Sequence, residues 1–127
     1  RNDMEIIILV GPPRCGKTRL AWRLQGEFGG LLSNALCFSG NVKLIDVIKD
    51  LDKLCKRPPA SLLFDDMPKE GMAHFKEIMD DETIKSKVMG VILIPSYIPD
   101  YLINLPNVQI WDKNRIHFEL YRRGIKI

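Results

Sequence analysis

Cysteine is scarce in this chain, and long hydrophobic runs are missing. The three cysteines, Cys15, Cys37 and Cys55, are an odd number and lack the close spacing of metal sites and redox motifs. This argues against a disulfide scaffold and a zinc site, and it predicts free thiols in an intracellular, reducing compartment. The longest apolar stretches are far below the roughly 20 residues of a membrane-spanning helix. There is also no signal-peptide pattern, so we expect no membrane partner.

Strong charge and repetition are missing as well. The net charge of the 127 residues is +3, which is compatible with a nucleic-acid partner but does not by itself indicate one. A hydrophobic content of 46% and a charged content of 28% are ordinary for a globular protein. No repeat or linker divides the chain, so we expect one domain, residues 1–127. Because the chain begins with Arg1, we expect this domain to be excised from a longer protein.

Short apolar runs alternate with helical patterns along the chain. A run such as IIILV, without alternation, is typical of a strand buried on both faces of a parallel sheet. The alternation predicts a three-layer α/β fold with a mostly parallel five-stranded sheet. The predicted strands are residues 6–10, 35–38, 62–64, 88–94 and 108–111. The predicted helices carry the apolar sets Leu20, Leu24 and Phe28; Leu44, Ile45, Ile48 and Leu51; Met72, Phe75 and Met79; and residues 99–103, with the first two ended by Gly29-Gly30 and Pro58-Pro59.

The segment GPPRCGKT, between the first strand and the first helix, fits the P-loop pattern G-x-x-x-x-G-K-[ST]. Its glycines let successive backbone N–H groups point at phosphate oxygens, and the helix N-terminus adds its positive dipole end. Lys17 is expected to bind the β- and γ-phosphates, and Thr18 to bind Mg²⁺. The motif therefore predicts a nucleoside triphosphate, ATP, with Mg²⁺. The predicted binding residues are Gly11, Pro12, Pro13, Arg14, Cys15, Gly16, Lys17, Thr18 and Arg19.

A pair of acids, in the sequence LLFDD, ends the third predicted strand. A P-loop site needs an acidic residue at the end of a neighbouring strand to hold the magnesium ion. We predict that Asp65 does this and that Asp66 orients or deprotonates the attacking water. The other interpretation is a solvated turn that begins a helix. Its place one strand and one helix beyond the P-loop favours the metal-site interpretation.

Polar residues also follow the fourth predicted strand, in the sequence VILIPSY. A polar group there, Ser96 or Tyr97, would lie between the γ-phosphate and the attacking water. A plain strand end with a Pro-Ser turn is the alternative.

The site as predicted has no arginine of its own to neutralise transition-state charge, so we expect hydrolysis to depend on self-association. The candidate arginines are Arg115, Arg122 and Arg123, in KNRIHFELYRR. Alternation of Ile116, Phe118 and Leu120 predicts a final strand that begins at Arg115. Solvated surface charges are the other interpretation of all three arginines.

One strand intervenes in sequence between the P-loop strand and the acidic strand, and the acid is doubled. These features favour ATPases that activate water and convert hydrolysis into motion. Nucleotide kinases carry an arginine-rich lid, which this sequence lacks. A small nucleotide or metabolite kinase, and a module that binds nucleotide without hydrolysis, remain as alternatives.

Taken in order, the three motifs resemble the superfamily 3 helicase domain, an AAA+-like ATPase, and in particular the replication proteins of circovirus-type single-stranded DNA viruses. The segment GPPRCGKTRLAW is similar to the loop of those proteins, Asp65 and Asp66 match their paired aspartates, and Ser96 stands at their serine position. The resemblance runs from Ile6 to Tyr121. Tyr97 departs from it, since the family usually has asparagine there.

The resemblance implies a Mg²⁺-dependent ATPase of DNA replication that acts on single-stranded nucleic acid. It further implies a ring of identical subunits, usually a hexamer, and a place in the host nucleus. It favours Arg122 or Arg123 as the arginine that reaches a neighbour. The DNA-gripping hairpin of the family is reduced here to DDETIKSKVM, with Lys85 and Lys87 as its only basic candidates. A solvated loop is the other interpretation of these lysines. A packaging, assembly or regulatory ATPase of the same branch is the alternative. Trp22 and Trp111 are expected in the core or at an interface, with a base-stacking role as the less favoured alternative.

Overall fold

Five parallel strands form one sheet in the order β2-β3-β4-β1-β5. The computed structural model describes residues 4–28, 34–54 and 60–126. The prediction of an α/β fold with a parallel five-stranded sheet is confirmed, and four of the five strands extend beyond their predicted ranges at one or both ends. The strands are β1 (Glu5–Leu9), β2 (Asn34–Ser39), β3 (Ala60–Met67), β4 (Val88–Pro95) and β5 (Val108–Trp111).

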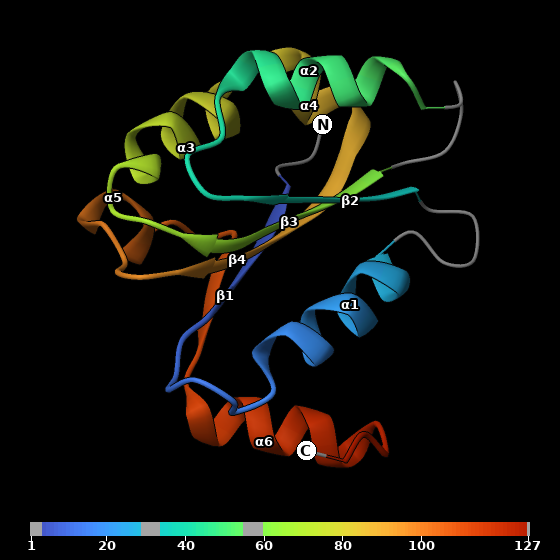
Figure 1. The fold of residues 1–127 in the computed structure, drawn as a ribbon, viewed down its shortest axis with the longest axis vertical. Coiled ribbons are helices and arrows are strands. Elements are labelled where there is room, and N and C mark those ends of the chain that lie inside the picture. Colours follow the sequence, from blue (N-terminus) through green and yellow to red (C-terminus); the bar gives the residue numbers. More distant parts are fainter. Residues whose placement is uncertain (1–3, 29–33, 55–59, 127) are drawn as a thin grey trace.

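Helices cover both faces of the sheet and give the molecule three layers (Figure 1). α1 and α6 lie on one face, and α2, α3 and α4 lie on the other. The helices are α1 (Lys17–Phe28), α2 (Leu44–Asp52), α3 (Gly71–Asp80), α4 (Glu82–Lys87), α5 (Asp100–Ile103) and α6 (Lys113–Arg122).

The layering explains why the central strands are apolar along their whole length. Side chains of a strand point alternately to the two faces of the sheet, so a strand with a helix on each side must be apolar throughout. In β1, Ile6 and Ile8 pack on the α2–α4 side, whereas Ile7 and Leu9 pack on the α1–α6 side. Leu62 and Leu63 of β3 divide in the same way.

The apolar stripe of α2 differs from the predicted one at two residues, because it includes Val47 and leaves out Ile45. Val47 and Leu51 are buried and Leu44 and Ile48 are partly buried, which is the i, i+3, i+4, i+7 spacing of one helix face. Ile45 was predicted on this face but is 54% exposed. It lies about 100° round the helix from Leu44 and therefore points to solvent.

The predicted final strand is wrong, because residues 113–122 form α6. Asp112 caps this helix, since its carboxylate accepts a hydrogen bond from the backbone N–H of Arg115 at 2.9 Å. Ile116 and Leu120, four residues apart, are buried on one helix face. Phe118, which a strand would have buried beside them, is 56% exposed.

The segment DDETIKSKVM forms α4 and the start of β4. Asp81 caps α4 by accepting a hydrogen bond from the N–H of Ile84 at 3.0 Å. Gly29-Gly30, Pro58-Pro59 and Cys55 lie outside the described residues, and so do the predicted ends of the first two helices. In the part of the chain that is described, none of the helices has the length and apolar character needed to cross a membrane.

Candidate nucleotide-binding site

The glycine loop, residues 10–16, connects the carboxyl end of β1 to the first residue of α1. Two of its residues are in the left-handed region, Arg14 with φ 66° and Gly16 with φ 96°. Left-handed residues within a tight loop turn neighbouring N–H groups toward a common point, which is the geometry of a backbone anion site. Glycine adopts this conformation without strain, whereas a residue with a Cβ adopts it at a cost of about 1–2 kcal/mol.

Gly11 is required for a different reason, which is close packing. A Cβ atom built on Gly11 would lie 2.8 Å from Sγ of Cys15 and within 3.9 Å of Lys113 and Ile116. The Cys15 side chain is buried on the α1–α6 face, so it packs the loop from beneath. The N–H of Val10 also donates to the carbonyl of Trp111 at 3.0 Å. The start of α6 is therefore packed directly against the glycine loop.

The structure brings Thr18 and Asp65 together, the two residues predicted to hold the metal ion. Oγ1 of Thr18 donates a hydrogen bond of 3.3 Å to Oδ2 of Asp65, and both residues are partly exposed. Nζ of Lys17 lies 2.5 Å from the carbonyl oxygen of Gly11, so its ammonium group stays over the glycine loop. The Thr18 hydroxyl and the Asp65 carboxylate thus meet at the carboxyl edge of the sheet, and the Lys17 ammonium group lies on the adjoining glycine loop.

A β-bulge contains Asp65 and Asp66. Phe64 pairs with Leu93 and Met67 pairs with Pro95, so the two aspartates stand opposite a single residue of β4. Asp66 has φ 55°, is exposed, and does not end the strand as predicted, because β3 continues to Met67. Bulges often re-aim side chains next to functional sites, and this one interrupts the regular alternation of side chains along β3 at the two aspartates.

Ser96 lies at the same edge as the aspartates. It follows β4, which lies between β1 and β3 in the sheet, so the order of strands places it between the glycine loop and the acids. Its N–H donates to the carbonyl of Met67 at 2.9 Å, which joins the ends of β3 and β4. Tyr97 is 40% exposed, and Nζ of Lys69 lies 5.6 Å from its ring centre.

The three candidate arginines all bond to Glu119, which is 3% exposed. Nε of Arg115 and Nε of Arg122 each lie 2.7 Å from one of its oxygens. Burial opposes ionisation of Glu119, but hydrogen bonds from Arg115, Arg123 and Arg122 outweigh it and lower the pKa of the carboxyl to about 2. Sequence reasoning missed this residue. The sequence pattern that could have revealed it is the position of the three arginines, four residues before, three after and four after Glu119. On a helix this spacing places all three beside its carboxylate.

These arginines differ in their distance from the glycine loop. Arg115 is in the first turn of α6, beside the loop, and its guanidinium lies 4.5 Å from the ring centre of Trp111. Arg123 follows the last turn of α6 and donates two hydrogen bonds of 2.8 Å to Glu27, at the far end of α1. Its side chain is 8% exposed. Of the three, the structure brings Arg115 close to the predicted site and keeps Arg122 and Arg123 away from it.

Cys37 is a further residue near the acids that the sequence did not single out. It lies on β2, where the neighbouring Ser39 pairs with Asp65 of β3. Cys37 is exposed, but partial burial of its thiol raises the pKa of that group, and the negative charge of Asp65 raises it further. The pKa of this thiol therefore depends on the charge of Asp65, the predicted metal ligand.

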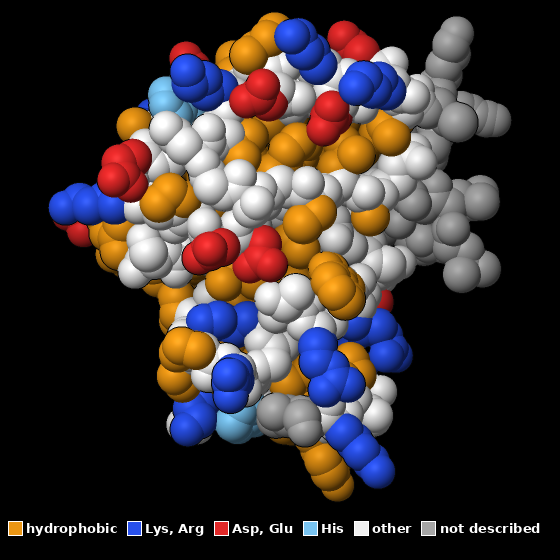
Figure 2. Space-filling model, viewed as in Figure 1, with side chains coloured by type: hydrophobic (Ala, Val, Ile, Leu, Met, Phe, Trp, Pro, Cys, Tyr) orange, Lys and Arg blue, Asp and Glu red, His pale blue; other side chains and the backbone are white. Residues whose placement is uncertain are grey.

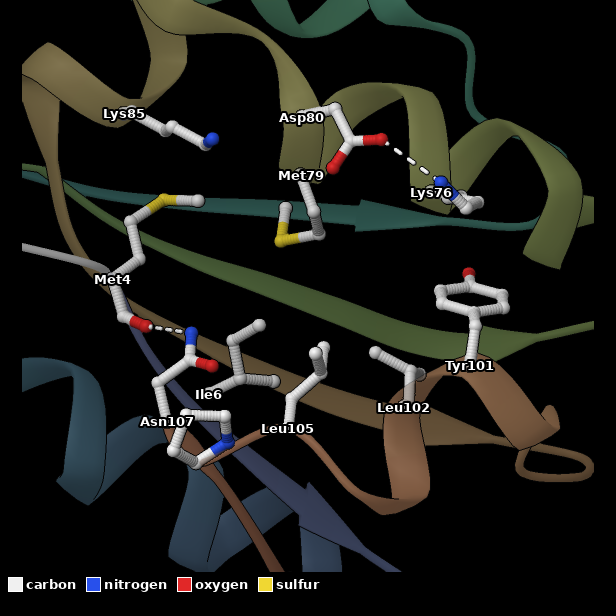
Figure 3. Close-up of a pocket in the computed structure, with 11 residues that line it drawn as sticks. Met4, Ile6, Lys76, Met79, Asp80, Lys85, Tyr101, Leu102, Leu105 and Asn107 are labelled. Carbon is white, nitrogen blue, oxygen red and sulfur yellow. Dashed lines mark hydrogen bonds and ion pairs between the residues drawn. The ribbon is translucent and has the colours of Figure 1, made fainter.

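Lys85 and Lys87 lie at the opposite edge of the sheet, because they directly precede β4. Lys85 lines a cavity of about 420 Å³ that Figure 3 shows beside the start of β1. Its floor is apolar and includes Met4 and Ile6, and Lys76 on its rim pairs with Asp80 at 3.1 Å. Lys85 pairs with Glu82 at 3.7 Å, and Lys87 pairs with Asp52 at 3.5 Å. Neither lysine is near the glycine loop.

In residues 4–28, 34–54 and 60–126 there is no group of three or more His, Cys, Asp or Glu side chains that could hold a metal ion. The predicted magnesium site would use one hydroxyl and one carboxylate, with phosphate and water as the other ligands. No protein-family model, no curated protein and no solved structure matches the chain.

Proposed function

We propose that this domain binds ATP with Mg²⁺ and hydrolyses it. The observation that carries the proposal is the 3.3 Å hydrogen bond between Thr18 and Asp65. These residues come from two motifs far apart in sequence, and a P-loop site requires their side chains at one place. The left-handed turn at Gly16 and the ammonium of Lys17 lie beside them.

Each side chain has a role in this proposal. Bound Mg·ATP would supply the γ-phosphoryl group and a divalent charge that neutralises it. Lys17 would exchange the carbonyl of Gly11 for phosphate oxygens, and Thr18 and Asp65 would hold the ion. Asp66, exposed at the bulge, accepts a proton from the attacking water, and Ser96 orients that water. A positioned base of this kind contributes a rate factor of about 10²–10⁴.

We further propose that hydrolysis drives remodelling of single-stranded nucleic acid by an oligomeric ring, as in a superfamily 3 helicase. The support is the order of the three motifs and the placing of β4 between the glycine-loop strand and the acidic strand. Arg115 is the arginine best placed to complete a site, since it lies at the loop edge and 47% of its side chain is exposed.

A binding and turnover experiment tests the ATPase proposal. ATP binding with Mg²⁺ would be measured by calorimetric titration, and turnover by phosphate release. The chains compared are the parent, Lys17→Ala and the control Lys49→Ala, which changes an exposed residue of α2. Lys17→Ala should lose binding or turnover, and Lys49→Ala should retain both. Equal ATP binding and hydrolysis by Lys17→Ala would refute the phosphate site. Transfer of phosphate to a small molecule instead of water would show a kinase.

A further inference from the structure

Charge is divided unevenly between the two sides of the sheet. The glycine loop with α1, and the segment 112–126 that contains α6, together carry nine Lys or Arg and three Asp or Glu residues. The remaining described residues carry seven Lys or Arg and twelve Asp or Glu residues. In Figure 2 the lower part of the molecule, where α1 and α6 lie, shows mainly blue and orange side chains. The small net charge of the chain therefore conceals a basic α1–α6 layer.

Exposed aromatic rings lie between the arginines on both helices of this layer. On α1, Arg19, Trp22 and Arg23 have the spacing of one helix face, and Trp22 is 63% exposed. Trp22 is therefore outside the core, which was one of the two places predicted for it, whereas Trp111 is buried as expected.

On α6 the outward face has the same composition. Arg115, Phe118 and Arg122 are spaced by three and four residues, with Tyr121 next to Arg122. Phe118 is 56% exposed and Tyr121 is 82% exposed. Singly exposed apolar residues are ordinary, but several large rings exposed on one layer of the molecule mark a contact surface.

We propose that the α1–α6 face, formed by these residues of α1 and α6, binds single-stranded nucleic acid. Guanidinium groups bind phosphates, and unpaired bases stack on exposed aromatic rings, so an alternation of the two fits an unpaired strand. The proposal rests on the nucleic-acid partner of the proposed function and assigns its site to a surface away from Lys85 and Lys87.

The ion pairs of this face leave its positive charge largely in place. Glu119 pairs with Arg115, Arg122 and Arg123, and Glu27 pairs with Arg23 and Arg123. Two carboxylates therefore face four arginines and cannot neutralise them all. On the other side of the sheet, several carboxylates already pair with lysines of their own helices, as in Lys53–Asp50 and Lys76–Asp80. A second copy of the chain would therefore offer the α1–α6 face carboxylates that are partly paired already, whereas the phosphates of a nucleic acid are unpaired.

The test measures fluorescence anisotropy of a labelled oligothymidylate of about 20 nucleotides, without ATP or Mg²⁺, at several salt concentrations. Trp22→Ala and Phe118→Ala should each weaken binding about fivefold or more, which is the scale of one lost stacked base. Trp22→Phe should retain most of the parent's affinity, because it keeps an aromatic ring at this position. The matched control is Ile45→Ala, because Ile45 is 54% exposed on α2 and should bind as the parent does.

Salt and strandedness give two further readouts. Arg23→Gln should lower the slope of log affinity against log salt by about 0.7, as expected for one lost phosphate contact to a single strand. The control Lys49→Gln should leave the slope unchanged. The aromatic substitutions should have little effect on a duplex, because its bases are already stacked.

Four outcomes would overturn the proposal. They are unchanged oligothymidylate binding in both aromatic variants, loss of binding in Lys17→Ala, loss of self-association in the aromatic variants with nucleic-acid binding intact, and binding to phosphatidylserine vesicles that these variants abolish while oligothymidylate binding persists. A chain that shows no ATP turnover but follows the expected oligonucleotide pattern would refute the ATPase proposal and leave this one standing.

Discussion

Arg115 and Glu119 are joined by a 2.7 Å hydrogen bond one turn apart on α6. Because its three arginine partners lower the pKa of Glu119 to about 2, the folded state favours the ionised carboxylate relative to the unfolded chain. The resulting stabilisation is fully present above the unfolded pKa, near 4.5, and is lost as the pH falls through about 2.

Urea unfolding of the parent chain and Glu119→Gln between pH 6 and pH 3 tests this. Between pH 6 and pH 3 the unfolding free energy of the parent chain should fall by about 2 kcal/mol because of Glu119 alone. Glu119→Gln should be less stable than the parent at pH 6, and its unfolding free energy should depend less steeply on pH. Parallel pH profiles for the two chains would show that the carboxylate is not ionised in the folded state as described.

The Cys37 thiol offers a test of the charge on Asp65. Since burial and then Asp65 raise the pKa of this thiol, Asp65→Asn should lower it and increase the thiolate fraction. Alkylation of Cys37 by iodoacetamide at pH 8, followed by peptide mass spectrometry, should become faster. Asp66→Asn is the control and should change the rate less. Equal rates in the parent chain and Asp65→Asn would place Asp65 too far from Cys37.

Asp66→Asn should separate binding from chemistry. The variant should bind Mg²⁺ and ATP as the parent does but hydrolyse ATP about a hundredfold more slowly or worse, because it lacks the base. Asp65→Asn should chiefly weaken the dependence of binding on Mg²⁺. Calorimetric titration and phosphate release distinguish the two, and exchanged phenotypes would reverse the assignment of roles.

The arginines of α6 should also divide by function. Arg115→Ala should lower turnover by up to three to five decades if Arg115 completes a neighbour's site. Mixing this variant with Lys17→Ala should restore activity, since each chain supplies what the other lacks. Arg123→Ala should instead lower the unfolding free energy by about 2 kcal/mol, because Glu27 and Glu119 lose a charged partner. Rescue of turnover by mixing with Arg123→Ala, and not with Arg115→Ala, would contradict this division.

Much of the fold was predictable because local pattern and burial agree. The unbroken apolar run from Ile6 to Leu9 is typical of a strand covered on both faces, and the P-loop spacing located the start of α1. The two-residue alternation of apolar side chains gave the wrong prediction for α6, where Ile116, Phe118 and Leu120 match a strand pattern by coincidence. The burial of Glu119 was invisible to hydropathy, since its cost is offset by arginines that meet it only on a helix.

The candidate site divides in the same way. Residue types and spacing predicted Thr18 and Asp65 as partners, and parallel strands brought their side chains to one edge. The bulge at Asp65 and Asp66 was not predictable, because it is a property of the pairing between β3 and β4. The left-handed conformation of Asp66 follows from that bulge. Sequence alone could not reveal it, since aspartate adopts this conformation only occasionally.

A double-mutant cycle on Thr18 and Asp65 tests the central claim, that these two residues hold one magnesium ion at the glycine loop. The measurement is the affinity for ATP with and without Mg²⁺ for the parent chain, Thr18→Ala, Asp65→Asn and the double variant. If both residues serve one ion, each single variant should lose most of the Mg²⁺-dependent gain in affinity, and the double variant should lose little more. Additive losses, or a full Mg²⁺ effect in the double variant, would contradict the account.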